Sequence, residues 1–165
     1  MRQRKLGALL LLVVVMVCGM LLTACGEHTK PSSVEDFMSI ASKHTMTIID
    51  QSSKIGQGSK IKSLHLATKG EEKDTRIQLE FYLMESKDAC KDTYDEVTNQ
   101  FKASYSKKSG YEESHSEEGS YASTIISTDT KYYKVARIGD TLVVGIAPVQ
   151  GGKTELETLF DELGY

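Results

Sequence analysis

Residues 76–84 read RIQLEFYLM, and this stretch decides the fold class. Every second residue is apolar, and the apolar set is Ile77, Leu79, Phe81 and Leu83. The residues between them are Gln78, Glu80, Tyr82 and Met84. A period of two is typical of a β-strand with one buried face and one face toward solvent. The stretch therefore predicts a sheet that is covered on one side.

Four further segments have strand character. Residues 60–69 come before the first stretch, and a charged turn containing Gly70 connects the two as a hairpin. Segments 121–128, 131–138 and 141–148 follow each other through turns at Asp129-Thr130 and Gly139-Asp140. Because 141–148 is nearly all apolar, we expect it at the centre of the sheet. Residues 45–50 are β-branched and compatible with an extended segment.

Three segments repeat their apolar residues at helical spacing. The first begins at Ser32, where Ser32 and Glu35 have the spacing of a capping box. The second spans about 86–106 and the third about 153–163. Their apolar stripes are Phe37, Ile40, Ala41; Cys90, Tyr94, Val97, Phe101; and Leu156, Leu159, Phe160, Leu163.

These elements predict an α+β domain of order α-β-β-α-β-β-β-α. We expect a two-layer sandwich, with a mainly antiparallel sheet of about five strands covered by two or three helices. Residues 106–120 are polar and acidic, and they are predicted to be a flexible loop. Residues 34–165 form one globular domain in this interpretation.

The first 24 residues have the layout of a secretory signal. Residues 1–7 (MRQRKLG) are cationic, and residues 8–24 contain no charged side chain. Leu22-Thr23-Ala24-Cys25 resembles the lipobox of bacterial lipoproteins. An uncleaved membrane helix and an ordinary signal peptide are the alternatives.

The lipobox resemblance implies a modification and a location. Cys25 Sγ would receive a diacylglyceryl group, and a signal peptidase would cut between Ala24 and Cys25. Residues 1–24 are then removed, and residues 25–33 are the lipidated cysteine and a polar tether. Two or three acyl chains, palmitate among them, would hold the protein on the extracytoplasmic face of the cell membrane. Gly26 leaves the envelope type open, Gram-positive or Gram-negative.

A second resemblance covers most of residues 25–165. The strand at 77–81, the helix around Phe101, the segment VARIGDTL (135–142) and the closing Leu163-Gly164-Tyr165 are similar to small uncharacterised lipoproteins of Gram-positive bacteria. This resemblance implies an α+β domain after a lipobox, and it brings no established activity. Cys25 is therefore the one functional residue that it carries over.

Charge excludes one class of partner. The chain has a formal net charge of −3, but three of its 20 basic residues and none of its 23 acidic ones lie in 1–24. Residues 25–165 therefore carry −6, which argues against binding to nucleic acid. The same charge is expected to repel the domain from an anionic membrane surface.

The search for chemistry finds no catalytic, cofactor or metal motif. His28, His44, His65 and His115 have no close metal-ligand spacing. Cys90 lies on an apolar helical face and is expected to be a buried thiol. The acidic run 112–118 contains His115, but a solvated loop is favoured over a cation site. Gly151-Gly152 is interpreted as a plain turn.

Two weaker candidates remain open. Tyr111, Tyr121, Tyr132 and Tyr133 could form an aromatic patch for glycan or peptide, or they could pack in the sheet. Tyr132 and Tyr133 are adjacent, so one is expected in the core and the other toward solvent. We expect Arg137 to pair with an acidic residue on a neighbouring strand, and an anion site is the alternative.

The leading hypothesis is a membrane-anchored extracytoplasmic lipoprotein that acts as a binding module in the cell envelope. Its partner could be an envelope protein, peptidoglycan or a small solute. One alternative is an envelope enzyme, which a deep pocket collecting His65, Arg137 or carboxylates would favour. The other is a solute-capturing accessory of a transporter.

Overall fold

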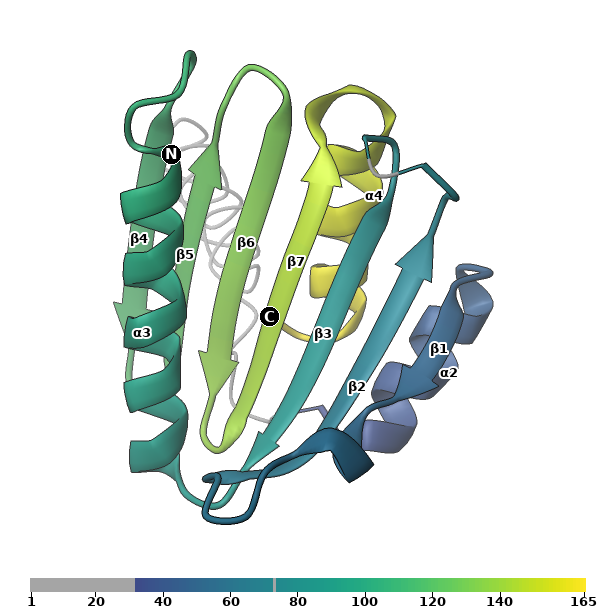
Figure 1. The fold of residues 1–165 in the computed structure, drawn as a ribbon, viewed down its shortest axis with the longest axis vertical. Coiled ribbons are helices and arrows are strands. Elements are labelled where there is room, and N and C mark those ends of the chain that lie inside the picture. Colours follow the sequence, from purple (N-terminus) through teal and green to yellow (C-terminus); the bar gives the residue numbers. More distant parts are fainter. Residues whose placement is uncertain (1–31, 73) are drawn as a thin grey trace, which may run out of the picture.

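Seven antiparallel strands form one sheet in the order β1-β2-β3-β7-β6-β5-β4 (Figure 1). The computed structural model describes residues 32–72 and 74–165, so Ala24, Cys25 and His28 lie outside the described residues. The strands are β1 (Thr47–Asp50), β2 (Ile61–Lys69), β3 (Ile77–Met84), β4 (Glu112–Glu118), β5 (Tyr121–Ser127), β6 (Lys131–Ile138) and β7 (Thr141–Pro148). The helices are α2 (Val34–Lys43), α3 (Lys87–Tyr105) and α4 (Val149–Glu162), with a short 3-10 helix η1 (Ser52–Lys54).

The predicted α+β class is confirmed, but the predicted two-layer, five-stranded sandwich is wrong. Two more strands, β1 and β4, form the two edges of the sheet. Alternate residues of the central strand β7 also belong to different cores: Val143 packs with α2 and α4, whereas Val144 packs with α3. Helices therefore lie on both faces of the sheet, α3 on one and α2 with α4 on the other (Figure 1).

The predicted acidic loop 106–120 is also wrong, because β4 occupies most of it. All seven residues of β4 are exposed, and each pairs with a residue of β5, from Glu112 with Ser127 to Glu118 with Tyr121. A strand at an edge that buries neither face has no apolar alternation to reveal it. Charged side chains are also the usual protection of such an edge against pairing with other chains.

The helix ends agree with the sequence analysis within a few residues. The cap of α2 is Ser33 and not Ser32, with Asp36 completing the capping box. Ser86 caps α3 by accepting a hydrogen bond from the amide of Ala89. The backbone of α4 is not helical at Gln150 and Gly151, so its regular part begins close to the predicted position 153.

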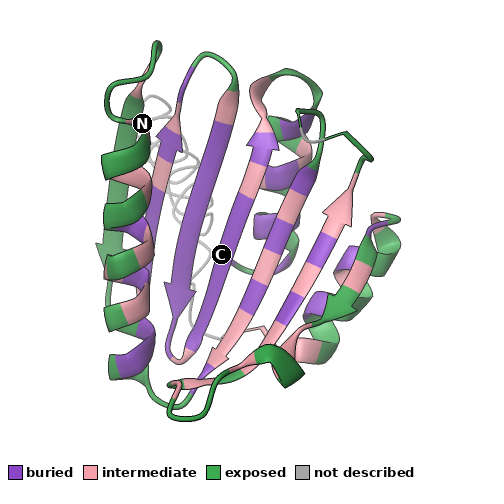
Figure 2. Ribbon diagram, in the orientation of Figure 1, coloured by how far each residue is buried: buried purple, intermediate pink, exposed green. Residues whose placement is uncertain are grey.

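Helix α3 covers only part of its face of the sheet. It packs on β5, β6, β7 and β3, whereas β1 and β2 lie outside its main contacts. Among the described residues, no α-helix lies over β1, β2 or most of β3 on this face (Figure 1). In Figure 2, β6 and β7 are buried along most of their length, whereas β3 alternates between buried and half-buried residues.

No helix in 32–72 or 74–165 is long and apolar enough to cross a membrane.

Candidate functional site

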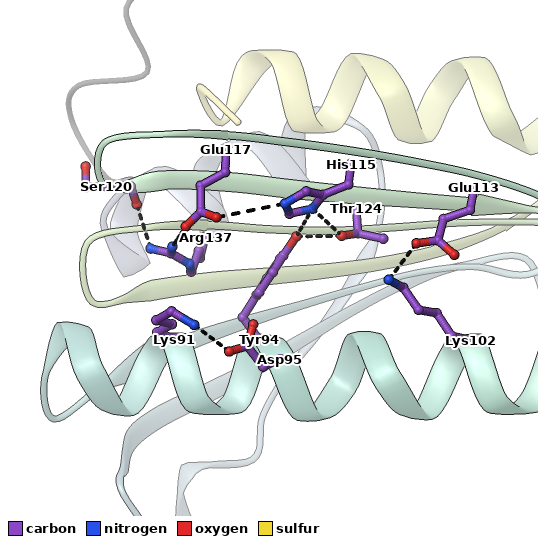
Figure 3. Close-up of polar contacts among 10 residues, drawn as sticks. All are labelled: Lys91, Tyr94, Asp95, Lys102, Glu113, His115, Glu117, Ser120, Thr124 and Arg137. Atoms are coloured by element: carbon purple, nitrogen blue, oxygen red, sulfur yellow. Dashed lines mark hydrogen bonds and ion pairs between the residues drawn. The ribbon is translucent and has the colours of Figure 1, made fainter.

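Two surfaces on the α3 side of the sheet gather polar side chains. The first lies between α3 and the β4 edge and is drawn in Figure 3. Strand register creates it, because His115 of β4 lies beside Thr124 of β5, and Glu117 lies beside Ala122, which in turn pairs with Arg137 of β6. We call Tyr94, His115, Glu117, Thr124 and Arg137 the β4-edge cluster.

The hydroxyl of Tyr94 lies at the centre of the β4-edge cluster. Its Oη shares a hydrogen bond of 2.6 Å with Thr124 Oγ1 and lies 3.3 Å from His115 Nδ1. His115 Nδ1 is in turn 3.1 Å from Thr124 Oγ1. Burial raises the pKa of Tyr94, although the hydrogen bond to Thr124 opposes this shift. Tyr94 therefore keeps its proton near neutral pH and orders its neighbours.

Arg137 is the buried cation of the β4-edge cluster. Its side chain is 8% exposed, and Nη2 lies 2.6 Å from Glu117 Oε1. Nη1 donates to the carbonyl oxygen of Ser120 at 3.1 Å, and the guanidinium lies over the ring of Tyr94. The predicted acidic partner is therefore present, but it comes from β4, two strands from β6 in the sheet, because the short Ala122 leaves room above β5.

Replacing Glu117 with Gln is expected to lower the free energy of unfolding by about 1–2 kcal/mol, because a buried guanidinium would lose its counter-charge. The value is below the roughly 3–5 kcal/mol expected for a fully buried pair, since the Glu117 side chain is 50% exposed and solvent screens the pair. Urea unfolding measures it. Asp92→Asn is the matched control, because the Lys60–Asp92 pair is exposed at both ends and should contribute less than about 0.5 kcal/mol. Equal losses in both variants would contradict this assignment.

The β4-edge cluster has one array that resembles a catalytic triad. The side chain of His115 lies between those of Thr124 and Glu117. The distance between His115 Nε2 and Glu117 Oε2 is 3.9 Å. A nucleophile needs access to its substrate and an oxyanion donor beside it. Thr124 is 2% exposed and its hydroxyl is hydrogen-bonded to Tyr94, so it is poorly placed to attack a substrate. The adjoining hollow of about 250 Å³ is open to solvent.

The deep pocket of the enzyme alternative is not formed by the residues that the sequence analysis proposed. His65 pairs in register with Phe81 and its ring lies 6.4 Å from that of Phe37 on α2. Arg137 lies on the other face of the sheet, under α3. In the described segments, no group of three His, Cys, Asp or Glu residues could hold a metal ion.

Cys90 is buried, as predicted. Its Sγ lies 3.4 Å from the carbonyl oxygen of Thr141, and burial raises the pKa of the thiol to about 12. The thiolate is the reactive form, so this cysteine is chemically inert near neutral pH.

The expectation for the tyrosine pair is wrong. Tyr132 and Tyr133 are 2% and 3% exposed, so neither points to solvent. They do point to opposite faces, but a helix covers each: Tyr132 packs in the core beneath α4, and Tyr133 lies against Tyr105 and Phe101 of α3. The two residues therefore cannot form an aromatic binding patch.

The second surface is the half of the sheet that α3 leaves uncovered, which we call the open face. Its residues are Ile49 of β1, Leu64, Leu66 and Thr68 of β2, Gln78, Glu80 and Tyr82 of β3, and Ile146 of β7. Ile49 is 45% exposed and the others are half-buried. At its centre, Gln78 Nε2 donates to Glu80 Oε1 at 2.7 Å, and the hydroxyl of Tyr82 donates to Glu80 Oε2.

The sequence analysis did not assign either surface. The β4-edge cluster depends on strand register, which the sequence pattern did not provide. The open face was visible in part, because Gln78, Glu80 and Tyr82 were placed together on the less apolar side of the strand at 76–84.

No protein-family model matches the chain, and no curated protein matches its sequence. A crystal structure of a GTP-binding regulator from Thermotoga maritima is 11% identical, with a TM-score of 0.50 over 82% of this chain and 89% of that chain. The extracellular domain of PknH from Mycobacterium tuberculosis is 8% identical, with a TM-score of 0.48 over 82% of this chain and 96% of that chain. At 11% identity, the likeness to the first structure shows a related fold and nothing of function.

Proposed function

We propose that this chain is a membrane-anchored extracytoplasmic lipoprotein whose domain acts as a binding module of the cell envelope. The anchor part rests on the sequence, where Leu22-Thr23-Ala24-Cys25 follows a cationic segment and an uncharged apolar one. Residues 26–31 lie between this cysteine and the first described residue, so the tether is short.

The binding part rests on one structural observation, the open face. An antiparallel sheet with helices on both sides normally hides its apolar residues, yet this one leaves Ile49, Leu64 and Leu66 without a covering helix among the described residues. Uncovered apolar surface rimmed by polar groups is typical of interaction sites. The enzyme alternative is less well supported, because Thr124 is 2% exposed and its hydroxyl is already hydrogen-bonded to Tyr94.

Replacing Cys25 with Ala tests the anchor. The variant should lose incorporation of labelled palmitate almost completely, because the thioether-forming sulfur is absent, and it should remain unprocessed or leave the membrane fraction. Cys90→Ala is the matched control: it removes a cysteine that is buried in the domain and should leave labelling and fractionation unchanged. Full labelling of the Cys25→Ala variant would overturn the lipoprotein assignment.

A further inference from the structure

The open face has the width of one helix. It is formed mainly by three strands, β1, β2 and β3, which together span roughly 14 Å at the usual strand spacing. An α-helix with its side chains is about 10–12 Å across. A helix that lies along these strands would therefore cover Ile49, Leu66 and Glu80, which are in register across the three strands, in one layer with α3.

Helix α3 shows what such a layer needs on this side of the sheet. Its apolar side chains point toward the sheet, and Cys90 and Tyr94 are buried against the strands. At its far margin, Lys102 Nζ lies 2.5 Å from Glu113 Oε1, so a helix cation meets a strand carboxylate. The covering element on this face thus combines an apolar stripe with a basic residue.

The open face has the matching carboxylate, and none of the described residues that define it is a Lys or Arg. Glu80 lies between Leu66 of β2 and Val144 of β7 in register, and its two oxygens accept hydrogen bonds from neutral donors, Gln78 and Tyr82. Among residues 32–72 and 74–165, no Lys or Arg forms an ion pair with it. An ionised carboxylate has about four acceptor sites, so these two donors leave room for a third.

A second copy of the chain fits this face poorly. In a two-fold dimer each open face would meet its own copy, because such an interface uses the same patch on both subunits. Glu80 lies near the centre of the patch, so the two carboxylates would approach each other without a cation between them. Like charges brought together at an interface cost several kcal/mol and select against that partner.

From these observations we infer that the open face binds an amphipathic helix of a partner protein, which places an apolar stripe on Leu64, Leu66 and Ile49 and a Lys or Arg on Glu80. The inference rests on the proposed binding function and names its partner by chemistry. The partner helix would present its apolar anchors at spacings of three and four residues, as amphipathic helices do in other complexes.

Site-specific photo-crosslinking of the full chain in its native membranes tests this inference. A photoreactive phenylalanine analogue in place of Leu66 should give an adduct, whereas the same analogue in place of Ala103, an exposed residue of α3, should give none. Glu80→Gln should reduce the adduct roughly tenfold, because it removes one charge-assisted contact. Ile49→Lys should reduce it as well, and since Ile49 is 45% exposed this change should leave the thermal unfolding midpoint unaltered.

Mass spectrometry of the crosslinked peptide identifies the occupant. The inference is supported if the crosslinked segment has apolar residues at helical spacing and a Lys or Arg among them. A charge swap gives further support: the adduct should be lost in the Glu80→Lys chain and restored when that Lys or Arg of the partner is replaced with Glu. The inference is overturned by an adduct with a second copy, an extended peptide, a lipid or a glycan, or by a yield that Glu80→Gln does not change. Those results leave the binding function standing, whereas no adduct from position 66 overturns the binding function as well.

Discussion

Between about pH 11 and pH 13 the protein is expected to unfold in one step, with the buried Tyr132, Tyr133 and Tyr165 and the half-buried Tyr82 losing their protons only as the domain opens. Burial is the largest cause that raises the pKa of four of them well above the ordinary value of about 10. The negative charge of Glu80 adds to the shift of Tyr82, and that of Glu157 adds to the shift of Tyr132. The four are Tyr82, Tyr132, Tyr133 and Tyr165.

The sign of the effect follows from where the protons are held. Above about pH 10 the unfolded chain releases its tyrosine protons while the folded domain keeps them, so the folded state binds more protons and its stability falls as the pH rises. Each tyrosine contributes about 1.4 kcal/mol per pH unit, and four together contribute about 5.5 kcal/mol per unit. That slope consumes a typical stability of about 5–15 kcal/mol within one to three units.

Lys134 acts in the opposite direction over a narrower range. It is 9% exposed, its Nζ lies 3.1 Å from the carbonyl oxygen of Tyr165, and burial lowers its pKa. The contribution of Lys134 to the free energy of unfolding increases with pH only up to the ordinary lysine pKa of about 10.4. Above that pH it therefore does not offset the effect of the four tyrosines.

Near-ultraviolet absorbance of tyrosinate and far-ultraviolet circular dichroism, recorded on the same samples, measure this transition. A single coincident step is expected, and Tyr82→Phe should move it to higher pH because one of the four protons no longer counts. Gradual ionisation of the tyrosines in a domain that keeps its circular dichroism would show that the folded state does not hold their protons.

The two strands that the sequence analysis did not count are the two edges of the sheet, and the reason is physical. Alternation of apolar and polar residues arises where one face of a strand is buried, so it marked β3 clearly. β4 has the sequence EESHSEE and buries neither face, so its residues look like a loop. The residue preferences of β-strands reflect how well side chains pack on a half-buried sheet surface. β4 has no such surface, so these preferences do not identify it.

The two-layer prediction was wrong because the alternation of β3 does not extend to the other central strands of the sheet. The alternation in β3 is real, and it exists because the outer side of β3 belongs to the open face. β6 and β7 are buried almost throughout because helices lie above and below them. The nearly unbroken apolar run 141–148 was therefore evidence for two covered faces, and together the two patterns locate the uncovered half of the sheet.

The β4-edge cluster required information that a residue pattern does not contain. Tyr94, Thr124 and His115 are spread over 30 positions of the chain, and the antiparallel register of β4 and β5 brings two of them side by side. A shift of one residue would send His115 to the opposite face. The pairing of Arg137 with an acid could be predicted, since a buried guanidinium needs one, but the partner strand could not.

Replacing Phe160 with Ala is expected to lower the free energy of unfolding by about 3–5 kcal/mol, since a fully buried ring is removed and its cavity only partly collapses. Phe160 is a residue of α4, and its ring packs against the central strand β7. The ammonium of Lys134 lies 4.6 Å from the centre of this ring. The loss therefore also removes the favourable contact between a buried cation and an aromatic face. Urea unfolding of the variant measures the change.

Gly145 of β7 provides the test that this loss comes from packing at one place. A Cβ at position 145 would lie 2.6 Å from Phe160 Cε2 and 2.8 Å from Leu156 Cδ1, so Gly145→Ala should by itself cost about 1–3 kcal/mol by overpacking. In the double variant the new methyl group occupies part of the space left by the ring, and the total loss should be smaller than the sum by about 1 kcal/mol or more. Gly56→Ala is the matched control, because nothing lies within 4 Å of a Cβ there and it should add to Phe160→Ala without coupling. Strict additivity at position 145 would mean that the α4 core relaxes around each change separately, and the ring would then not be the element that keeps a side chain out of the middle of β7.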